Sequence, residues 1–137
     1  MLPEEYAFLP AVSLAAMIRD GVVSSVQLTD FFIGRISSLD ESINSVAVRC
    51  FEEARARAAA LDADLAQGKG VCGPLHGVPI TVKENNDVAG LPSTLGNPSK
   101  VRNIASRNSP AVQKLVDAGA VIIGKTNCAL DLNDVQT

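Results

Sequence analysis

The chain lacks tryptophan and holds a single histidine, and aromatic residues make up only 4% of its 137 residues. Its core must therefore be built mainly from aliphatic side chains. These are plentiful, because hydrophobic residues account for 47% of the chain and charged residues for 20%. Such proportions are typical of a globular protein and argue against disorder. The length suits one ordinary domain.

Long apolar runs and an excess of basic residues are also absent. No run approaches the ~20 apolar residues that span a bilayer, and Glu4 and Glu5 stand where a secretory signal carries basic residues. Twelve basic against fifteen acidic residues give a net charge of −3, which offers no electrostatic case for binding nucleic acid or a membrane. We therefore expect a cytoplasmic protein with neither partner. One basic cluster lacks interleaved aromatic residues and is interpreted as a solvated loop and helix face: Lys100, Arg102, Arg107 and Lys114.

Cysteine pairs and metal-ligand spacings are missing too. The three cysteines, Cys50, Cys72 and Cys128, are odd in number and widely spaced, which indicates reduced intracellular thiols that act as small hydrophobic residues. His76 has no partner at a spacing typical of metal ligands and is interpreted as a turn residue. We expect neither a metal nor a cofactor.

Helical and strand-like patterns alternate along the chain. Apolar residues recur at helical spacing after Ser13, after Ser25 and from Phe51 to Leu65, with the two serines as expected helix caps. A fourth helix is expected after Ser109, because Pro110 suits the first helical position. Short strands are expected over residues 45–48, 79–83 and 120–123. This alternation predicts an α/β fold with crossover connections.

Lys83 ends the run 77–85, in which Ile80 and Val82 predict a buried strand and Pro79 suits the strand entrance. A lysine in this position either extends its amine to water from a half-buried stem or loses its charge. A free lysine titrates near ~10.4, and deep burial lowers that value by roughly 3–5 units, which makes the neutral amine a competent general base. The run alone leaves both interpretations open.

Residues 73–94, followed by 109–112 and 119–127, closely resemble the amidase signature family, whose members hydrolyse carbon–nitrogen bonds in amides. The resemblance covers nearly the whole chain, including its helical N-terminal part. It implies a mixed β-sheet covered by helices and a small-molecule amide substrate. It also implies that Lys83 is the lysine of a Ser–Ser–Lys catalytic triad.

The family's two serines lie in a Gly/Ser-rich segment downstream of the stretch 124–127, and this chain contains no Gly-Gly-Ser-Ser run. The family's enzymes are also several times longer. We therefore expect residues 1–137 to be the N-terminal portion of a single amidase-like domain, inactive alone, which binds its missing C-terminal part or self-associates. The alternative is a non-catalytic interaction module that retains the amidase N-terminal shape. Residues 128–131 lack the acidic–aromatic pair usual in tRNA-dependent amidotransferase subunits, which favours a free-standing amidase.

Residues 119–126 also satisfy the phosphate-loop pattern of glycine, four residues and Gly-Lys-Thr. That pattern needs a strand before it and a helix after it, so that backbone N–H groups surround the phosphates. Here the expected helix comes first, and the four spacer residues are apolar and suit a strand. We interpret the segment as a strand and expect no nucleotide. A serine hydrolase with a histidine base is not indicated either, because no Gly-x-Ser-x-Gly elbow is present.

Overall fold

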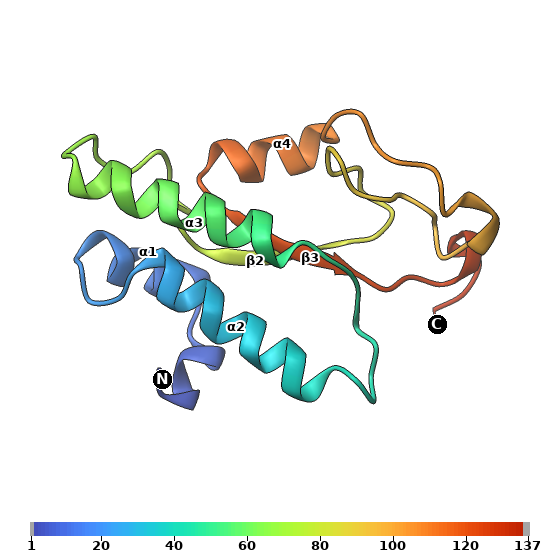
Figure 1. Ribbon diagram of the computed structural model, residues 1–137, viewed down its shortest axis with the longest axis horizontal. Coiled ribbons are helices and arrows are strands. Elements are labelled where there is room, and N and C mark those ends of the chain that lie inside the picture. The colour runs from blue at the N-terminus through green and yellow to red at the C-terminus, as the bar shows by residue number, and fades with distance from the viewer. Residues whose placement is uncertain (1, 136–137) are drawn as a thin grey trace.

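The computed structural model describes residues 2–135, and residues 1 and 136–137 lie outside it (Figure 1). Its strands are β1 (Val46–Arg49), β2 (Pro79–Lys83) and β3 (Val121–Thr126). Its α-helices are α1 (Ala11–Arg19), α2 (Ser25–Leu39), α3 (Phe51–Ala66) and α4 (Pro110–Asp117). Three short 3₁₀ helices complete the described elements: η1 (Glu4–Phe8), η2 (Pro98–Lys100) and η3 (Leu130–Leu132).

The three strands form one sheet in the order β1-β3-β2. The central strand β3 runs parallel to β2 and antiparallel to β1, so the sheet is mixed. Figure 1 shows α2 and α4 on opposite sides of the strands, and a long loop that leads from β2 to α4 past the strand ends. The expected α/β fold with a mixed sheet and covering helices is confirmed.

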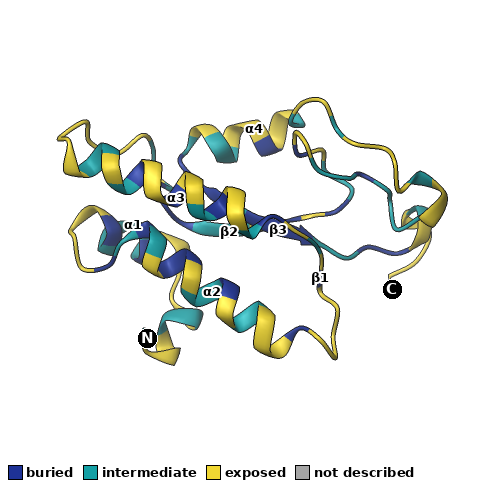
Figure 2. Ribbon diagram, viewed as in Figure 1, coloured by how far each residue is buried: buried dark blue, intermediate teal, exposed yellow. Residues whose placement is uncertain are grey.

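Helices cover both faces of the sheet. On one face, α2 and α3 pack on the β3 side chains Val121 and Ile123 through a buried stripe of α3: Ala54, Ala58 and Leu61. On the other face, Val112 of α4 packs near Val82 and Ile122. Figure 2 shows the buried residues gathered on the strands and on the inward sides of the helices. The stripe expected on α3 is therefore core packing.

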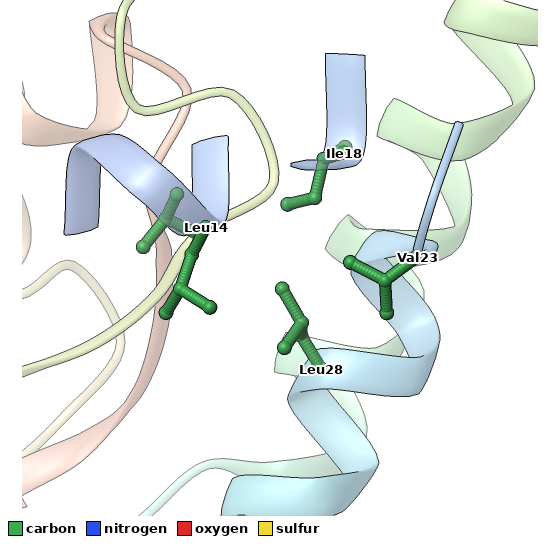
Figure 3. Close-up of a cluster of buried hydrophobic side chains, with 5 residues drawn as sticks. Leu14, Ile18, Val23 and Leu28 are labelled. Carbon is green, nitrogen blue, oxygen red and sulfur yellow. The ribbon is translucent and has the colours of Figure 1, made fainter. Parts of the chain in front are cut away.

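A third cluster joins α1 to α2 and to the segment before β2. It consists of Leu14, Ile18, Val23, Leu28 and Val78, each at most 4% exposed. Figure 3 shows the four labelled side chains of this cluster pointing toward one another. Full burial of one such side chain contributes roughly 1.5–3 kcal/mol. The core is aliphatic, as the scarcity of aromatic residues predicted.

The start of α2 differs by one residue from the sequence expectation. Ser24, not Ser25, is the cap: its hydroxyl accepts the Gln27 N–H at 3.0 Å, and the Gln27 side chain accepts the Ser24 N–H at 2.9 Å. Ser25 is fully buried, and its hydroxyl donates to the Gly77 carbonyl at 2.8 Å. The serine that looked like a cap instead joins α2 to the segment leading into β2.

Two other boundaries also move. Helix α1 begins after Pro10, so Ser13 lies inside the helix and caps nothing. Strand β3 continues to Thr126, past the apolar run that predicted it, because Lys125 and Thr126 still pair with β1 and β2. Among the described residues only the 3₁₀ helix η3 follows, so residues 121–126 of this motif are a strand and the motif is not a phosphate loop. Ser109 does cap α4, with Pro110 at its first position, as expected.

Candidate active site

Lys83 is the last residue of β2, opposite Thr126 in the parallel pairing with β3. The next residue, Glu84, continues this pairing, since its N–H donates to the Thr126 carbonyl at 2.9 Å. Val82 is buried, but Thr81 and Lys83 are exposed. The expectation of a fully buried strand is therefore wrong for β2. The reason is that side chains alternate between the two faces of a strand: Val82 packs near Val112 of α4, whereas Thr81 and Lys83 lie on the opposite face.

Glu84 is the buried carboxylate beside Lys83, with 3% of its surface exposed. It accepts the backbone N–H groups of Thr94 and of Leu95, the latter at 2.8 Å, and the Cys128 thiol lies 3.6 Å away. Burial acts to raise the pKa of Glu84. The hydrogen bonds from Thr94 and Leu95 and the charge of Lys125 outweigh it, so this pKa lies below its ordinary value.

Lys125 is the buried lysine of the chain, and none of its surface is exposed. Its ammonium donates to the Pro92 carbonyl and, at 2.9 Å, to the Ser93 hydroxyl. Burial lowers the pKa of Lys125, and the negative charge of Glu84 opposes this in part. Neither Lys125 nor Glu84 was predicted from the sequence to belong to the site. The only local signal in the sequence was the presence of a charged residue next to an apolar run: Glu84 follows β2, and Lys125 lies within β3.

His76 is held in a turn by both ring nitrogens. Nδ1 accepts the Cys72 N–H at 3.1 Å, so Nε2 carries the proton and donates to the Leu61 carbonyl at 3.2 Å. The ring is 2% exposed and joins the turn to α3. The interpretation as a turn residue is confirmed.

The other candidates from the sequence lie on the surface or in the core. Lys100 pairs with Asp131 at 2.6 Å, and the rest of its basic cluster is exposed, as a solvated face requires. All three cysteines are free thiols; Cys50 and Cys128 are buried, but Cys72 is exposed, so it is not the small core residue that was expected. Among residues 2–135 no helix is long and apolar enough to cross a membrane.

Comparison with known proteins matches the family model described as Amidase to residues 27–134. The indoleacetamide hydrolase of Bradyrhizobium diazoefficiens is 42% identical over 117 residues, which is 85% of this chain and 22% of that protein. An amidase of Pseudomonas putida is 38% identical over 120 residues, 87% of this chain and 25% of that protein. The native peptide amidase of Stenotrophomonas maltophilia has the same fold, with a TM-score of 0.86 at 30% identity over 93% of this chain and 26% of that one.

Fold and sequence together define a relative of amide hydrolases. The chain belongs to the amidase signature family. It spans about a quarter of the length of the relatives it matches.

Proposed function

We propose that residues 1–137 are the N-terminal portion of a single amidase-like domain that hydrolyses amide carbon–nitrogen bonds, with Lys83 as the lysine of its Ser–Ser–Lys triad. The observation that supports this most is the place of Lys83, at the carboxyl end of β2 and beside the parallel strand β3. Active sites of α/β folds lie at the carboxyl ends of parallel strands. Lys83 also occupies the family's lysine position in the run 77–85.

In the proposed reaction the neutral amine of Lys83 accepts a proton from a bridging serine, which takes the hydroxyl proton of the nucleophilic serine. The serine oxygen then bonds to the amide carbonyl carbon, the C–N bond breaks, and the leaving amine receives the relayed proton. Water, deprotonated through the same relay, attacks the acyl-enzyme and releases the acid and the free serine. Both serines and the N–H groups that hold the oxyanion would come from polypeptide outside this chain.

The exposure of Lys83 explains why the chain is expected to be inactive alone. A lysine acts as a base near neutral pH only when its charged form is destabilised, mainly by burial. This chain leaves the amine at the surface and has no Gly-Gly-Ser-Ser run. The proposed partner is therefore the C-terminal part of the amidase, which would cover the end of β2 and supply the serines. The proposed substrate is a small-molecule amide, and the absence of an acidic–aromatic pair in residues 128–131 favours a free-standing enzyme.

The test is an assay of aryl and alkyl amides with the chain alone and with its C-terminal complement, found by native mass spectrometry. The chain alone should show no turnover. In the complete enzyme, Lys83→Ala should lose most of kcat while the enzyme still folds. Lys83→Arg should be nearly as inactive, because a guanidinium stays protonated.

Lys69→Ala is the matched control, since Lys69 is an exposed lysine paired with Asp64 at 2.7 Å, and it should keep full activity. Retained kcat in either Lys83 variant would make Lys83 an ordinary surface lysine. Absence of any second polypeptide, together with a stable folded monomer, would favour the non-catalytic interaction module.

A further inference from the structure

Two buried side chains of opposite charge hold four consecutive residues of the loop between β2 and α4. These residues, 92–95, are called the clamped segment below. Lys125 binds its first half, through the Pro92 carbonyl and the Ser93 hydroxyl. Glu84 binds its second half, through the N–H groups of Thr94 and Leu95. The cation thus meets oxygen acceptors and the carboxylate meets N–H donors.

Burying a charge is strongly unfavourable in free energy unless the charge is paired and fully hydrogen-bonded. Hydrogen bonds to charged groups are shorter and stronger than neutral ones, so they can hold a segment that lacks regular structure. The clamped segment is such a case: Leu95 has a φ of 56°, in the left-handed region that non-glycine residues avoid. The two charges therefore impose one loop conformation that the local sequence alone disfavours.

The same two residues also enclose the backbone that carries Lys83. Glu84 directly follows Lys83, and its N–H is bound to β3 while its carboxylate is bound to the clamped segment. Lys125 lies opposite Val82, the residue before Lys83. The charge of Lys83 lowers the pKa of the Cys128 thiol, although burial and Glu84 raise it more, so the Lys83 amine lies within electrostatic reach of this cluster.

We propose that Glu84 and Lys125 are positioning residues for Lys83: together they hold the clamped segment on the ends of β2 and β3 and fix the direction in which the Lys83 amine leaves the sheet. This inference rests on the proposed role of Lys83 as a base. Proton transfer needs a donor–acceptor distance of roughly 2.6–3.2 Å, and a displacement of about 1 Å can cost ~100-fold in rate. A lysine at an exposed strand end has many rotamers. A fixed backbone at Lys83 fixes the direction of its Cα–Cβ bond and so restricts where its amine can lie.

The first test uses the chain itself, at a concentration where sedimentation shows a monomer, and needs no activity. Glu84→Gln and Lys125→Met each remove one charge; the first keeps the side-chain length and the second shortens the side chain by one atom. Both should speed hydrogen exchange at the Thr94 and Leu95 amides by at least ~10-fold, and both should shift the Lys83 Hε–Cε signal in NMR spectra, assigned by its loss in Lys83→Arg.

Asp40→Asn is the control. Asp40 is a buried carboxylate at the C-cap of α2, and it accepts the N–H groups of Ser45 and Val46 at 2.7 and 3.1 Å. This variant should speed exchange at those two amides and leave the Lys83 signal unchanged. Unchanged Lys83 signals in both Glu84→Gln and Lys125→Met would overturn the proposal.

The second test measures kinetics in the complete enzyme. Glu84→Gln and Lys125→Met should lower kcat by about 10–100-fold with little change in KM, whereas Asp40→Asn should destabilise the protein and keep kcat. If either charge variant fails to fold, Ser93→Ala removes one hydroxyl partner of Lys125 and should still lower kcat several-fold. If Lys83→Ala is inactive but the Glu84, Lys125 and Ser93 variants are fully active, the positioning role is refuted while the proposed function stands. An active Lys83→Ala would refute the proposed function itself.

Discussion

Replacing Gly124 by alanine should separate β1 from β3. Gly124 lies opposite Arg49 in the antiparallel pairing, next to an irregularity between Val46 and Val48. A Cβ atom built on Gly124 would lie 2.6 Å from Cγ1 of Val46 and 2.6 Å from the Val48 carbonyl oxygen. The valine side chain can rotate away, but the carbonyl belongs to the backbone, so only movement of β1 relieves the second contact.

The size of the effect follows from that geometry. Non-bonded atoms pack best at about 3.5–4.0 Å, so β1 has to withdraw by about 1 Å. Inserting one carbon into a packed site costs typically ~1–3 kcal/mol, and each backbone hydrogen bond lost adds ~0.5–1.5 kcal/mol. Two backbone hydrogen bonds flank the site, from the Cys50 N–H to the Ile123 carbonyl at 3.4 Å and from the Asn127 N–H to the Ser45 carbonyl at 2.8 Å. We expect Gly124→Ala to lower the free energy of unfolding by about 2–4 kcal/mol.

Urea unfolding, which gives the unfolding midpoint, and hydrogen exchange, which gives amide protection, test this prediction. With a urea dependence of ~1–3 kcal/mol per molar, the midpoint should fall by roughly 1 M or more, and the Cys50 and Asn127 amides should lose protection. Gly34→Ala is the matched control: Gly34 lies on the exposed side of α2 with no atom within 4 Å of the new Cβ, so alanine should stabilise by ~0.5–1 kcal/mol. Equal midpoints for wild type and Gly124→Ala would refute the close approach of β1.

Acid should weaken the junction of α2 and β1, because hydrogen bonding, above all from the Ser45 hydroxyl, lowers the pKa of Asp40 from 3.8 to about 2. A carboxylate whose folded-state pKa is depressed stabilises the fold above its unfolded pKa and loses this contribution as the pH falls, so the thermal midpoint should drop between about pH 4 and pH 2. Asp40→Asn should flatten this dependence, and an equally steep drop in the variant would contradict it. Thiol reagents near pH ~8 should modify the exposed Cys72 first, because burial raises the pKa of Cys50 to about 11 and also raises that of Cys128. Labelling of all three at one rate, read by mass spectrometry, would speak against this order. The chain alone should self-associate through the open edges of β1 and β2, which sedimentation and hydrophobic-dye binding can test. A monodisperse monomer that binds no dye would exclude it.

The parts of the fold that the sequence predicted well depend on local signals. Helix α4 begins where Ser109 and Pro110 indicate, since a cap and a proline at the first position act within one turn. The buried stripe of α3 follows from helical spacing alone. The cap of α2 was misplaced by one residue, because Ser24 and Ser25 offer the same hydroxyl and only the capping box with Gln27 distinguishes them.

The burial of the two lysines could not be predicted in the same way. Lys83 ends an apolar run but is exposed, because it lies on the face of β2 opposite the buried Val82. Lys125 follows a glycine in a loop-like motif but is fully buried. What distinguishes them is the segment 92–95, which covers Lys125 and comes from about thirty residues earlier in the chain. The burial of Asp40 was not predicted from the sequence, for a related reason. A short polar residue at a helix end indicates a turn, but its burial depends on the packing of β1.

The place of β3 in the sheet has a consequence for synthesis of the chain. Both other strands pair with β3, which is the last of the three in sequence. Among the strands that the structure describes, no native pairing can form on the ribosome before Val121 has emerged, and until then helix contacts such as those between α2 and α3 are available. Contacts between residues distant in sequence also slow folding, because the intervening chain must be ordered first. A nascent chain stopped before Val121 should therefore carry helices but no native sheet, with the apolar faces of those helices open to chaperones.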